Sequence, residues 1–499
     1  MLEYIGAILV SIFQFKVLLF IFLGIVTGII IGALPGLTPP IGMTLFIPIT
    51  MGMDPAAGLM LLGSVYMGAE YGGSISAILL NTPGTAAAAC TAFDGNPMAR
   101  QGRGNEALFA SITASSIGGI FGVIVLLLFT PMLAKLSLKF GPPEMFWLAI
   151  MGIAIVSSLS GKNFLKGFIG AAFGILISTI GVDTISGYPR FSFNSPDLLN
   201  GIELVPALIG LFSISQMLNL ITKKKVSIVD NDQKPMPYLQ VFKYIMKRPI
   251  LVLRSSTIGT IVGILPGAGG SIASFISYSF AKQSSKNPEE FGKGAVDGVI
   301  ASESANNAMV GGSLVPLLAF GIPGSASAAI LFGGLTIHGL IPGPRLFAER
   351  GDVAYGLMLG MLVSVFIMWA VGLVTAKYCP LIFKLPQSYI VSTVMVLSAI
   401  GSYSVNNSFF DVWIMAVFGL FGYVALRYGF TLPPIVLGLI LGPLAEEAYR
   451  RSITLASVHN SYFDYLFGRP ISIILIAITL LTFISGFYQE YRKVKTENA

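Results

Sequence analysis

The chain has 499 residues, of which 54% are hydrophobic and only 11% are charged. Soluble globular proteins contain about 25% charged residues, so this composition excludes a water-soluble enzyme. The two cysteines, Cys90 and Cys379, are too few for an extracellular disulfide scaffold. We therefore expect an all-α polytopic membrane protein.

Apolar stretches recur along the whole chain, and one membrane crossing takes roughly 20 apolar residues. They cover residues 17–34, 108–131, 145–159, 167–182 and 204–221, and then 250–265, 353–376, 389–400, 412–426, 435–444 and 471–484. The segments between them are apolar but rich in Gly, Pro, Ser and Asn. The pattern predicts about 12 transmembrane helices, some of them broken or folded into re-entrant hairpins.

Residues 223–248 form a long polar linker with seven Lys or Arg and two Asp. Short basic loops stay in the cytoplasm, so we expect this linker to be cytoplasmic and the acidic segment 183–203 to face outward. The excess of seven positive charges over the whole chain is concentrated most strongly in this linker, which argues against nucleic acid binding.

Similar segments recur on both sides of the linker in the same order. GALPGLTPPIG at 32–42 returns as GILPGAGGSIA at 263–273, and GGSISAILLNTPG at 72–84 returns as GGSLVPLLAFGIPG at 311–324. Weaker matches pair Gly174 with Gly419 and Gly210 with Gly438. Their order favours a duplicated gene over chance recurrence of Gly-Pro pairs.

The duplication predicts four parts of the chain. These are a first membrane repeat at 1–222, the basic cytoplasmic linker at 223–248, a second repeat at 249–460, and a final helix with a cytoplasmic tail at 461–499. If the linker and the tail share one side of the membrane, the second repeat without the final helix crosses an odd number of times. Two odd repeats in tandem must be inverted.

Motifs of several enzyme classes are missing from the sequence. It contains no G-x-x-x-x-G-K-[ST], no G-x-S-x-G and no H-E-x-x-H, and its two histidines, His338 and His459, lie far apart. We therefore expect neither an enzyme nor a zinc site, and no cofactor beyond a coupling Na⁺ or H⁺.

Pro-Gly pairs interrupt apolar segments four times, at Pro35, Pro83, Pro266 and Pro323. Proline removes a helical hydrogen bond, and glycine adds backbone freedom, so each pair predicts a helix break. Paired breaks in two halves indicate the binding site of a secondary transporter, although kinks that serve packing are the alternative. The predicted substrate-binding residues are Pro35, Gly36, Thr38, Ser74, Asn81, Thr82, Pro83, Gly84, Gly267, Ser271, Ser313, Pro323, Gly324 and Ser325.

A second polar cluster, SESANN at 302–307, contains Glu303, Asn306 and Asn307. A carboxyl group in an apolar segment is costly without a partner. We expect these three residues to couple transport to a cation, with Na⁺ at Asn306, Asn307 and the carbonyls of Gly267 and Gly324. A hydrogen-bonded helix contact or an interfacial cap is the alternative.

Four segments resemble those of the TctA family, the large membrane subunit of the tripartite tricarboxylate transporters. They are YMGAEYGGSISAILLNTPG, DGNPMARQGRGNEAL, ESANNAMVGGSLVPLLAFGIPGS and IHGLIPGPRLF. The resemblance runs from about Gly24 to Arg451. Thr85 stands where the family often carries an acidic residue, and Ser302 stands where a proline commonly precedes the Glu.

The resemblance implies a secondary active transporter in the bacterial inner membrane that imports a tricarboxylate or related carboxylate with a proton or sodium gradient. Its implied partners are a small TctB-like membrane subunit and a TctC-like solute-binding protein, periplasmic or lipid-anchored. A stand-alone carboxylate or anion carrier, a channel and an intramembrane enzyme remain as alternatives.

Overall fold

The computed structural model describes residues 6, 8, 10–159, 164–183, 186–222, 238–382, 386–457 and 461–497. Part of the predicted linker, 223–237, and the tail residues 498–499 lie outside them. Helices dominate the described chain, and β1 (Gly181–Val182) pairs with β2 (Pro189–Arg190) in an antiparallel ladder.

The helices before the linker include two π-helical segments and one 3₁₀ turn. They are α2 (Phe15–Ala33), α3 (Pro39–Thr50), α4 (Pro55–Leu80), α5 (Ala88–Met98), η1 (Ala99–Arg103), α6 (Gly104–Ser137), α7 (Pro142–Leu159), α8 (Phe164–Ser178), η2 (Asp197–Asn200), α9 (Leu204–Leu208), η3 (Ile209–Ile214) and α10 (Ser215–Ile221).

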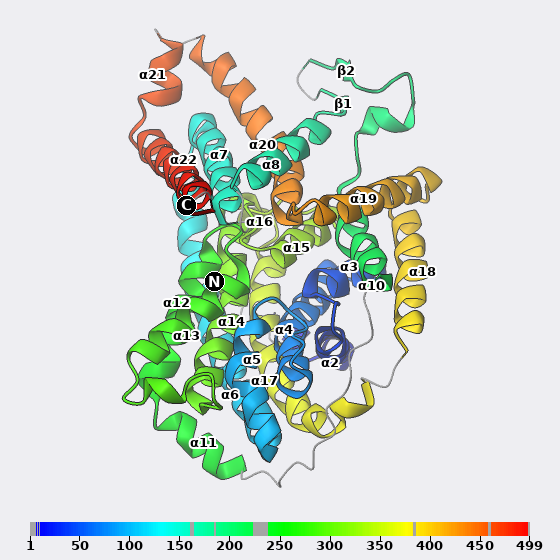
Figure 1. Cartoon of the computed structure of the whole chain (residues 1–499). Coiled ribbons are helices and arrows are strands. Elements are labelled where there is room, and N and C mark those ends of the chain that lie inside the picture. Colours follow the sequence, from blue (N-terminus) through cyan, green and yellow to red (C-terminus); the bar gives the residue numbers. More distant parts are fainter. Residues whose placement is uncertain are drawn as a thin grey trace.

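Among the described residues, thirteen helical segments follow residue 237 (Figure 1), and η4 is a 3₁₀ turn. They are α11 (Tyr238–Met246), α12 (Pro249–Ile264), α13 (Gly269–Gln283), η4 (Pro288–Glu290), α14 (Val296–Phe320), α15 (Ala326–Ile337), α16 (Pro344–Glu349), α17 (Gly351–Ile382), α18 (Gln387–Asn406), α19 (Phe409–Arg427), α20 (Leu432–Ala456), α21 (Tyr462–Phe467) and α22 (Pro470–Glu497).

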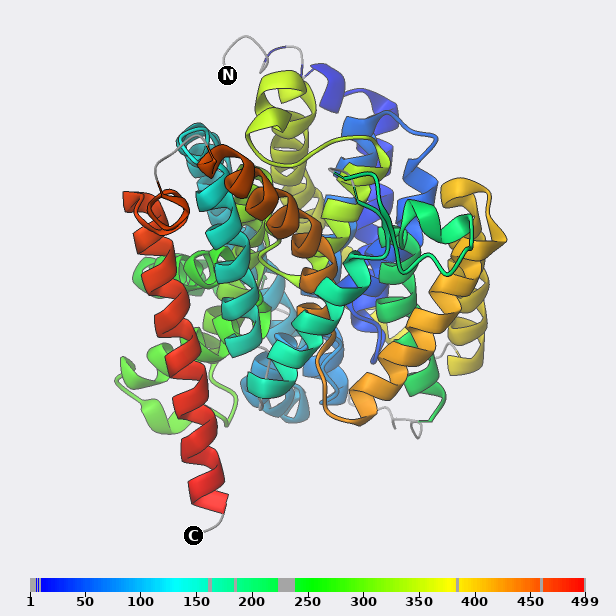
Figure 2. The same ribbon diagram turned by 90° about the horizontal axis from the view of Figure 1, so that it is seen from above.

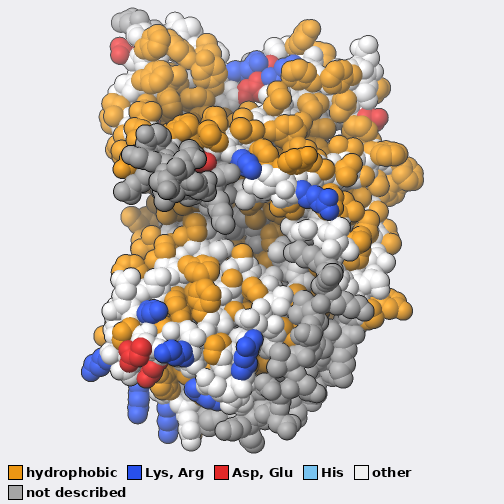
Figure 3. Space-filling view, in the orientation of Figure 1, with side chains coloured by type: hydrophobic (Ala, Val, Ile, Leu, Met, Phe, Trp, Pro, Cys, Tyr) orange, Lys and Arg blue, Asp and Glu red, His pale blue; other side chains and the backbone are white. Residues whose placement is uncertain are grey.

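Nine helical segments of the described chain are long and apolar enough to cross a membrane, and α3, α8, α12 and α15 are shorter apolar helices. Figure 3 shows hydrophobic side chains spread over much of one face and basic side chains gathered at the end near α11. These findings confirm a polytopic helical membrane protein. The count of about 12 crossings stays a prediction.

Helices α4 and α14 form the centre of the bundle, and both are buried along almost their whole length. Glycines let a neighbouring helix approach each of them closely. A Cβ on Gly32 of α2 would lie 2.1 Å from the Ala69 carbonyl oxygen, and one on Gly259 of α12 would lie 2.1 Å from that of Ala305. Small residues at helix contacts are typical of membrane bundles.

The third long helix of each half packs against the centre of the other half. Helix α6 lies along α14, where a Cβ on Gly118 would be 2.1 Å from the Ser304 carbonyl oxygen. Helix α17 lies along α4, where the hydroxyls of Ser64 and Ser364 are 2.8 Å apart. The two halves therefore share one core.

The outer helices exchange partners in the same way. Gly174 of α8 lies against the backbone of α20 at Gly438, and Gly210 of η3 lies against α19 at Met415 and Gly419. Gly174 thus contacts Gly438, the residue that the sequence matches with Gly210. In the same way, Gly210 contacts Gly419, the residue that the sequence matches with Gly174. Helix α22 lies outside this arrangement, at the rim beside α7 (Figure 2).

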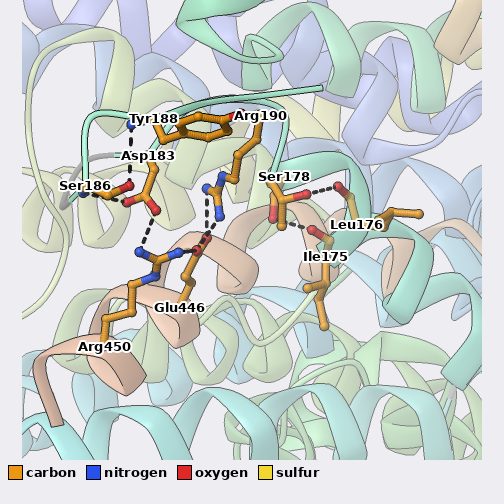
Figure 4. A network of polar contacts seen from close by, with 10 residues as sticks. Ile175, Leu176, Ser178, Asp183, Ser186, Tyr188, Arg190, Glu446 and Arg450 are labelled. Atoms are coloured by element: carbon orange, nitrogen blue, oxygen red, sulfur yellow. Dashed lines mark hydrogen bonds and ion pairs between the residues drawn. The ribbon is translucent and has the colours of Figure 1, made fainter. Parts of the chain in front are cut away.

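Ion pairs hold the β1–β2 hairpin on α20 (Figure 4). Arg190 of β2 lies 2.5 Å from Glu446, and Arg450 contacts Glu446 at 3.2 Å and Asp183 at 2.5 Å. Partly buried networks hold a loop more firmly than isolated surface pairs do. The acidic segment after α8 is therefore fixed to α20.

Candidate functional site

Each of the four Pro-Gly pairs lies between two helices, as the sequence predicts. The breaks separate α2 from α3, α4 from α5, α12 from α13, and α14 from α15. Two of the glycines, Gly36 and Gly267, have φ of 91° and 79°, and the residues that end α4 and α14, Asn81 and Gly321, have φ of 53° and 76°. Positive φ at these positions ends a helix sharply.

The breaks come together in pairs within each half. The Gly84 N–H donates to the Gly73 carbonyl at 3.3 Å, and a Cβ on Gly84 would lie 1.9 Å from the Gly32 carbonyl oxygen. In the second half, a Cβ on Gly324 would lie 2.5 Å from the Gly263 carbonyl oxygen. Only glycine fits at these two crossings, because a side chain would meet backbone.

The break between α14 and α15 is closed by hydrogen bonds. The Gly324 N–H donates to the Ser313 carbonyl at 3.2 Å, and the Gly324 carbonyl accepts from the Gly267 N–H at 2.9 Å. The hydroxyl of Ser325 accepts from the Ala328 N–H at 3.1 Å and caps α15. Pro323, Gly324 and Ser325 are buried.

The break between α4 and α5 is more open. Asn81 is exposed, Thr82 and Pro83 are half-buried, and Gly84 is buried. Pro35, Gly36, Thr38, Gly267 and Ser271 at the other two breaks are half-buried.

Buried hydroxyls connect the central helices to their surroundings. Ser74 of α4 is 2.7 Å from the hydroxyl of Ser111 on α6. Tyr66, also on α4, has its hydroxyl 3.2 Å from that of Ser313 and 2.9 Å from that of Ser325. Tyr66 therefore connects the first half to the break at Pro323. The sequence does not single out Tyr66, because a lone tyrosine in an apolar helix resembles the lipid-facing aromatic residues of such helices.

Glu303 is fully buried on α14. Thr91 of α5 donates to one carboxyl oxygen, and Ser115 of α6 donates to the other at 2.8 Å. None of the ion pairs formed by the described residues includes Glu303. A carboxyl group held by hydroxyls in a buried site suits a proton or a bound cation.

Asn306 and Asn307 face different neighbours. The Asn306 side-chain nitrogen donates to the Glu70 carbonyl at 3.2 Å, and its oxygen lies against Gly270, at the start of α13. The Asn307 nitrogen lies 3.8 Å from the sulfur of Met368 on α17. Both side-chain oxygens are buried without a donor in the described chain, which is costly unless a ligand satisfies them.

Carboxylates do not gather into a metal site in the part of the chain that the structure describes, where no three His, Cys, Asp or Glu side chains come together. Glu70, however, is buried on α4, and its backbone carbonyl accepts from the side chain of Asn306, three residues after Glu303 on α14. Two acidic residues thus lie in one region of the core.

Asp94 of α5 organises the approach to this region. One carboxylate oxygen accepts from the N–H groups of Gly292, Gly294 and Ala295 at 2.8, 2.9 and 2.8 Å, and the other accepts from the Tyr278 hydroxyl at 2.8 Å. Asp94 is fully buried. It fastens α5 to the loop before α14, a role that the sequence does not indicate, because the donors lie 198 to 201 residues further along the chain.

Comparisons with known proteins agree with the resemblance seen in the sequence. The model of the "Tripartite tricarboxylate transporter TctA family" matches residues 18–437. The "Uncharacterized 52.8 kDa protein in TAR-I ttuC' 3'region" of Agrobacterium vitis is 34% identical over 465 residues, 92% of this chain and 91% of that protein. The "Uncharacterized protein in TAR-II ttuC' 3'region" of the same organism is 34% identical over 239 residues, 48% of this chain and 98% of that protein. No solved structure matches the chain.

Proposed function

This chain belongs to the tripartite tricarboxylate transporter TctA family, and from that premise we propose that it is the permease of a secondary active transporter. It imports a tricarboxylate or related carboxylate with a proton or sodium gradient, across the bacterial inner membrane. A TctC-like solute-binding protein, periplasmic or lipid-anchored, delivers the substrate, and a small TctB-like membrane subunit completes the system.

The observation that carries this proposal is the burial of Glu303 among hydroxyls, without a basic partner in the described ion pairs. An unpaired charge in such a place is costly, so the carboxyl group binds a proton or a cation. Asn306 and Asn307, with carbonyl oxygens near Gly267 and Gly324, add oxygen ligands for Na⁺. The unpaired amide oxygens support this role.

The carboxylate substrate binds at the helix breaks. Free N–H groups at the start of a helix and the positive end of its dipole attract anions. The hydroxyls of Ser74, Ser313 and Ser325 and the amide of Asn81 add hydrogen-bond donors beside these breaks. Because few basic side chains are present there, the co-bound cation offsets part of the substrate's negative charge.

The two-repeat architecture belongs to the same proposal. Helix α6 of the first half packs on the second half, and helix α17 of the second half packs on the first. The contacts of Gly174 with Gly438 and of Gly210 with Gly419 also join one half to the other. Such an exchange is expected of duplicated halves related by a pseudo-two-fold axis. The inverted orientation rests on the odd number of crossings that the sequence predicts.

Transport by the complete system in proteoliposomes tests the function, with citrate as the probe. Wild type is expected to accumulate citrate above its external concentration only when an inward proton or sodium gradient is imposed and the binding protein is present. Downhill flux alone would indicate a channel, and full activity without partners would indicate a stand-alone carrier.

The variant Glu303→Gln keeps the size of the side chain and removes its charge. We expect it to lose gradient-driven accumulation, while Glu349→Gln, at an exposed position of α16, retains it. Equal citrate accumulation by both variants would show that transport does not depend on the charge of Glu303.

A further inference from the structure

A pocket opens beside the break between α4 and α5. Its volume is about 580 Å³, within the range of small-molecule sites, and its walls include Asn81, Phe93, Asn96, Arg100, Gln101 and Lys293. We propose that this pocket is a vestibule that binds the carboxylate groups of the substrate on its way between the break and the aqueous phase. The inference rests on the proposed function and adds a second anion site to it.

Two basic side chains give the pocket its charge. Arg100 and Lys293 are both exposed, and none of the ion pairs of the described residues includes either of them. Guanidinium and ammonium groups bind carboxylates through short, charge-assisted hydrogen bonds. A di- or tricarboxylate can give each group a carboxylate of its own, whereas a monocarboxylate has to share one carboxylate between them.

The chain holds these two cations together by contacts between distant segments. The Gln101 amide donates to the Lys293 carbonyl at 2.9 Å, and Asp94 binds the N–H groups of Gly292 and Gly294 on both sides of Lys293. These contacts fix the backbone that carries Lys293 beside the end of α5, where Arg100 follows. Both side chains therefore start from fixed points on the same pocket.

The pocket leads directly to the break at Pro83. Asn81, the left-handed residue that ends α4, is part of its wall. At the equivalent break, Pro323, Gly324 and Ser325 are buried, and Gly321 lines a different pocket together with Phe320 and Arg345. The vestibule belongs to the break at Pro83.

Helix α5 connects the vestibule to Glu303. Its residues Phe93 and Asn96 line the pocket, and Thr91, on the same helix, donates to the Glu303 carboxyl group. An anion that shifts α5 therefore changes the hydrogen bonding of the proposed coupling residue. Such contiguous contacts can carry coupling between two sites.

The vestibule lies at the linker end of the molecule. Arg248, just before α12, pairs with Asp297 of α14 at 2.8 Å, four residues after Lys293. Figure 1 shows α11 at the same end as the junction of α5 and α6. Because the linker is predicted to be cytoplasmic, the vestibule serves substrate release to the cytoplasm.

Citrate exchange by the complete transporter in proteoliposomes tests this assignment. Arg100→Gln and Lys293→Gln are each expected to raise the half-saturating citrate concentration on the linker side about tenfold, since each removes one charge-assisted contact. The matched control is Lys286→Gln, which lies on the same loop but outside the pocket. It is expected to leave the half-saturating citrate concentration unchanged.

Thiol labelling provides a readout that does not depend on transport. In the background Cys90→Ser and Cys379→Ser, citrate is expected to slow labelling of Phe93→Cys, at an exposed position of the pocket wall, by a membrane-impermeant maleimide, and to leave Gln283→Cys unaffected. Inorganic phosphate at equal ionic strength is expected to protect less, and equal protection would reassign the pocket to phosphate or lipid headgroups.

The outcomes separate the vestibule from the proposed function. If wild type transports citrate but neither basic substitution changes the half-saturating concentration and citrate gives no protection, the vestibule is refuted and the function stands. If wild type moves no citrate, the function fails, and the labelling result alone decides whether the pocket binds carboxylates.

Discussion

Replacing Asp94 by alanine tests whether this residue fastens α5 to the loop before α14. The substitution leaves the N–H groups of Gly292, Gly294 and Ala295 without their acceptor. An unsatisfied buried donor costs about 1–3 kcal/mol. Because these donors are partly exposed, we take the lower end of that cost, about 1 kcal/mol for each donor. The three donors together lower the free energy of local opening of the loop by about 3 kcal/mol.

Hydrogen exchange measured on a peptide covering residues 288–297 is the assay. A loss of about 3 kcal/mol corresponds to about hundredfold faster exchange of these amides, because every 1.4 kcal/mol is tenfold. Tyr278→Phe removes the fourth partner of Asp94 and is expected to change exchange little. Asp352→Ala, at an exposed ion pair, is the control. Unchanged exchange in Asp94→Ala would refute the role of Asp94.

Three further substitutions test the packing. Glu446→Gln weakens the ion pair that holds Arg190 of the β1–β2 hairpin on α20, and it is expected to speed limited proteolysis of residues 186–203 severalfold. Gly84→Ala is expected to prevent stable folding, seen as aggregation on size exclusion, because its Cβ would lie 1.9 Å from a backbone oxygen, whereas Gly52→Ala has open space and is tolerated. Tyr66→Phe removes a hydroxyl between two serines and is expected to cost about 1 kcal/mol, measured as a lower melting temperature.

The sequence predicted the helix breaks because their cause is local. A proline followed directly by a glycine removes a helical hydrogen bond and adds backbone freedom at one place, so the pairs at Pro35, Pro83, Pro266 and Pro323 could be placed between helices before any packing was known. Single prolines do not have this effect, since Pro131 lies inside α6. The sequence also drew attention to Glu303, because a carboxyl group in an apolar segment needs a reason.

The partners of these residues could not be predicted, since they come from distant helices. Thr91 and Ser115 donate to Glu303 from α5 and α6, and neither spacing nor composition connects them to it. The same is true of Arg100 and Lys293, which line one pocket only because the loop before α14 folds onto α5. Contacts between helices are set by tertiary packing, which leaves little trace in local patterns.

Coupling between the cation and the substrate is the central claim, and citrate affinity measured by calorimetry on the purified complete transporter tests it most directly. If Glu303 and its neighbouring oxygens take up the coupling cation, raising the sodium concentration or lowering the pH is expected to tighten citrate binding, by the same factor by which citrate tightens cation binding. Glu303→Gln is expected to abolish that dependence. A citrate affinity in wild type that stays constant across sodium concentration and pH would contradict the account.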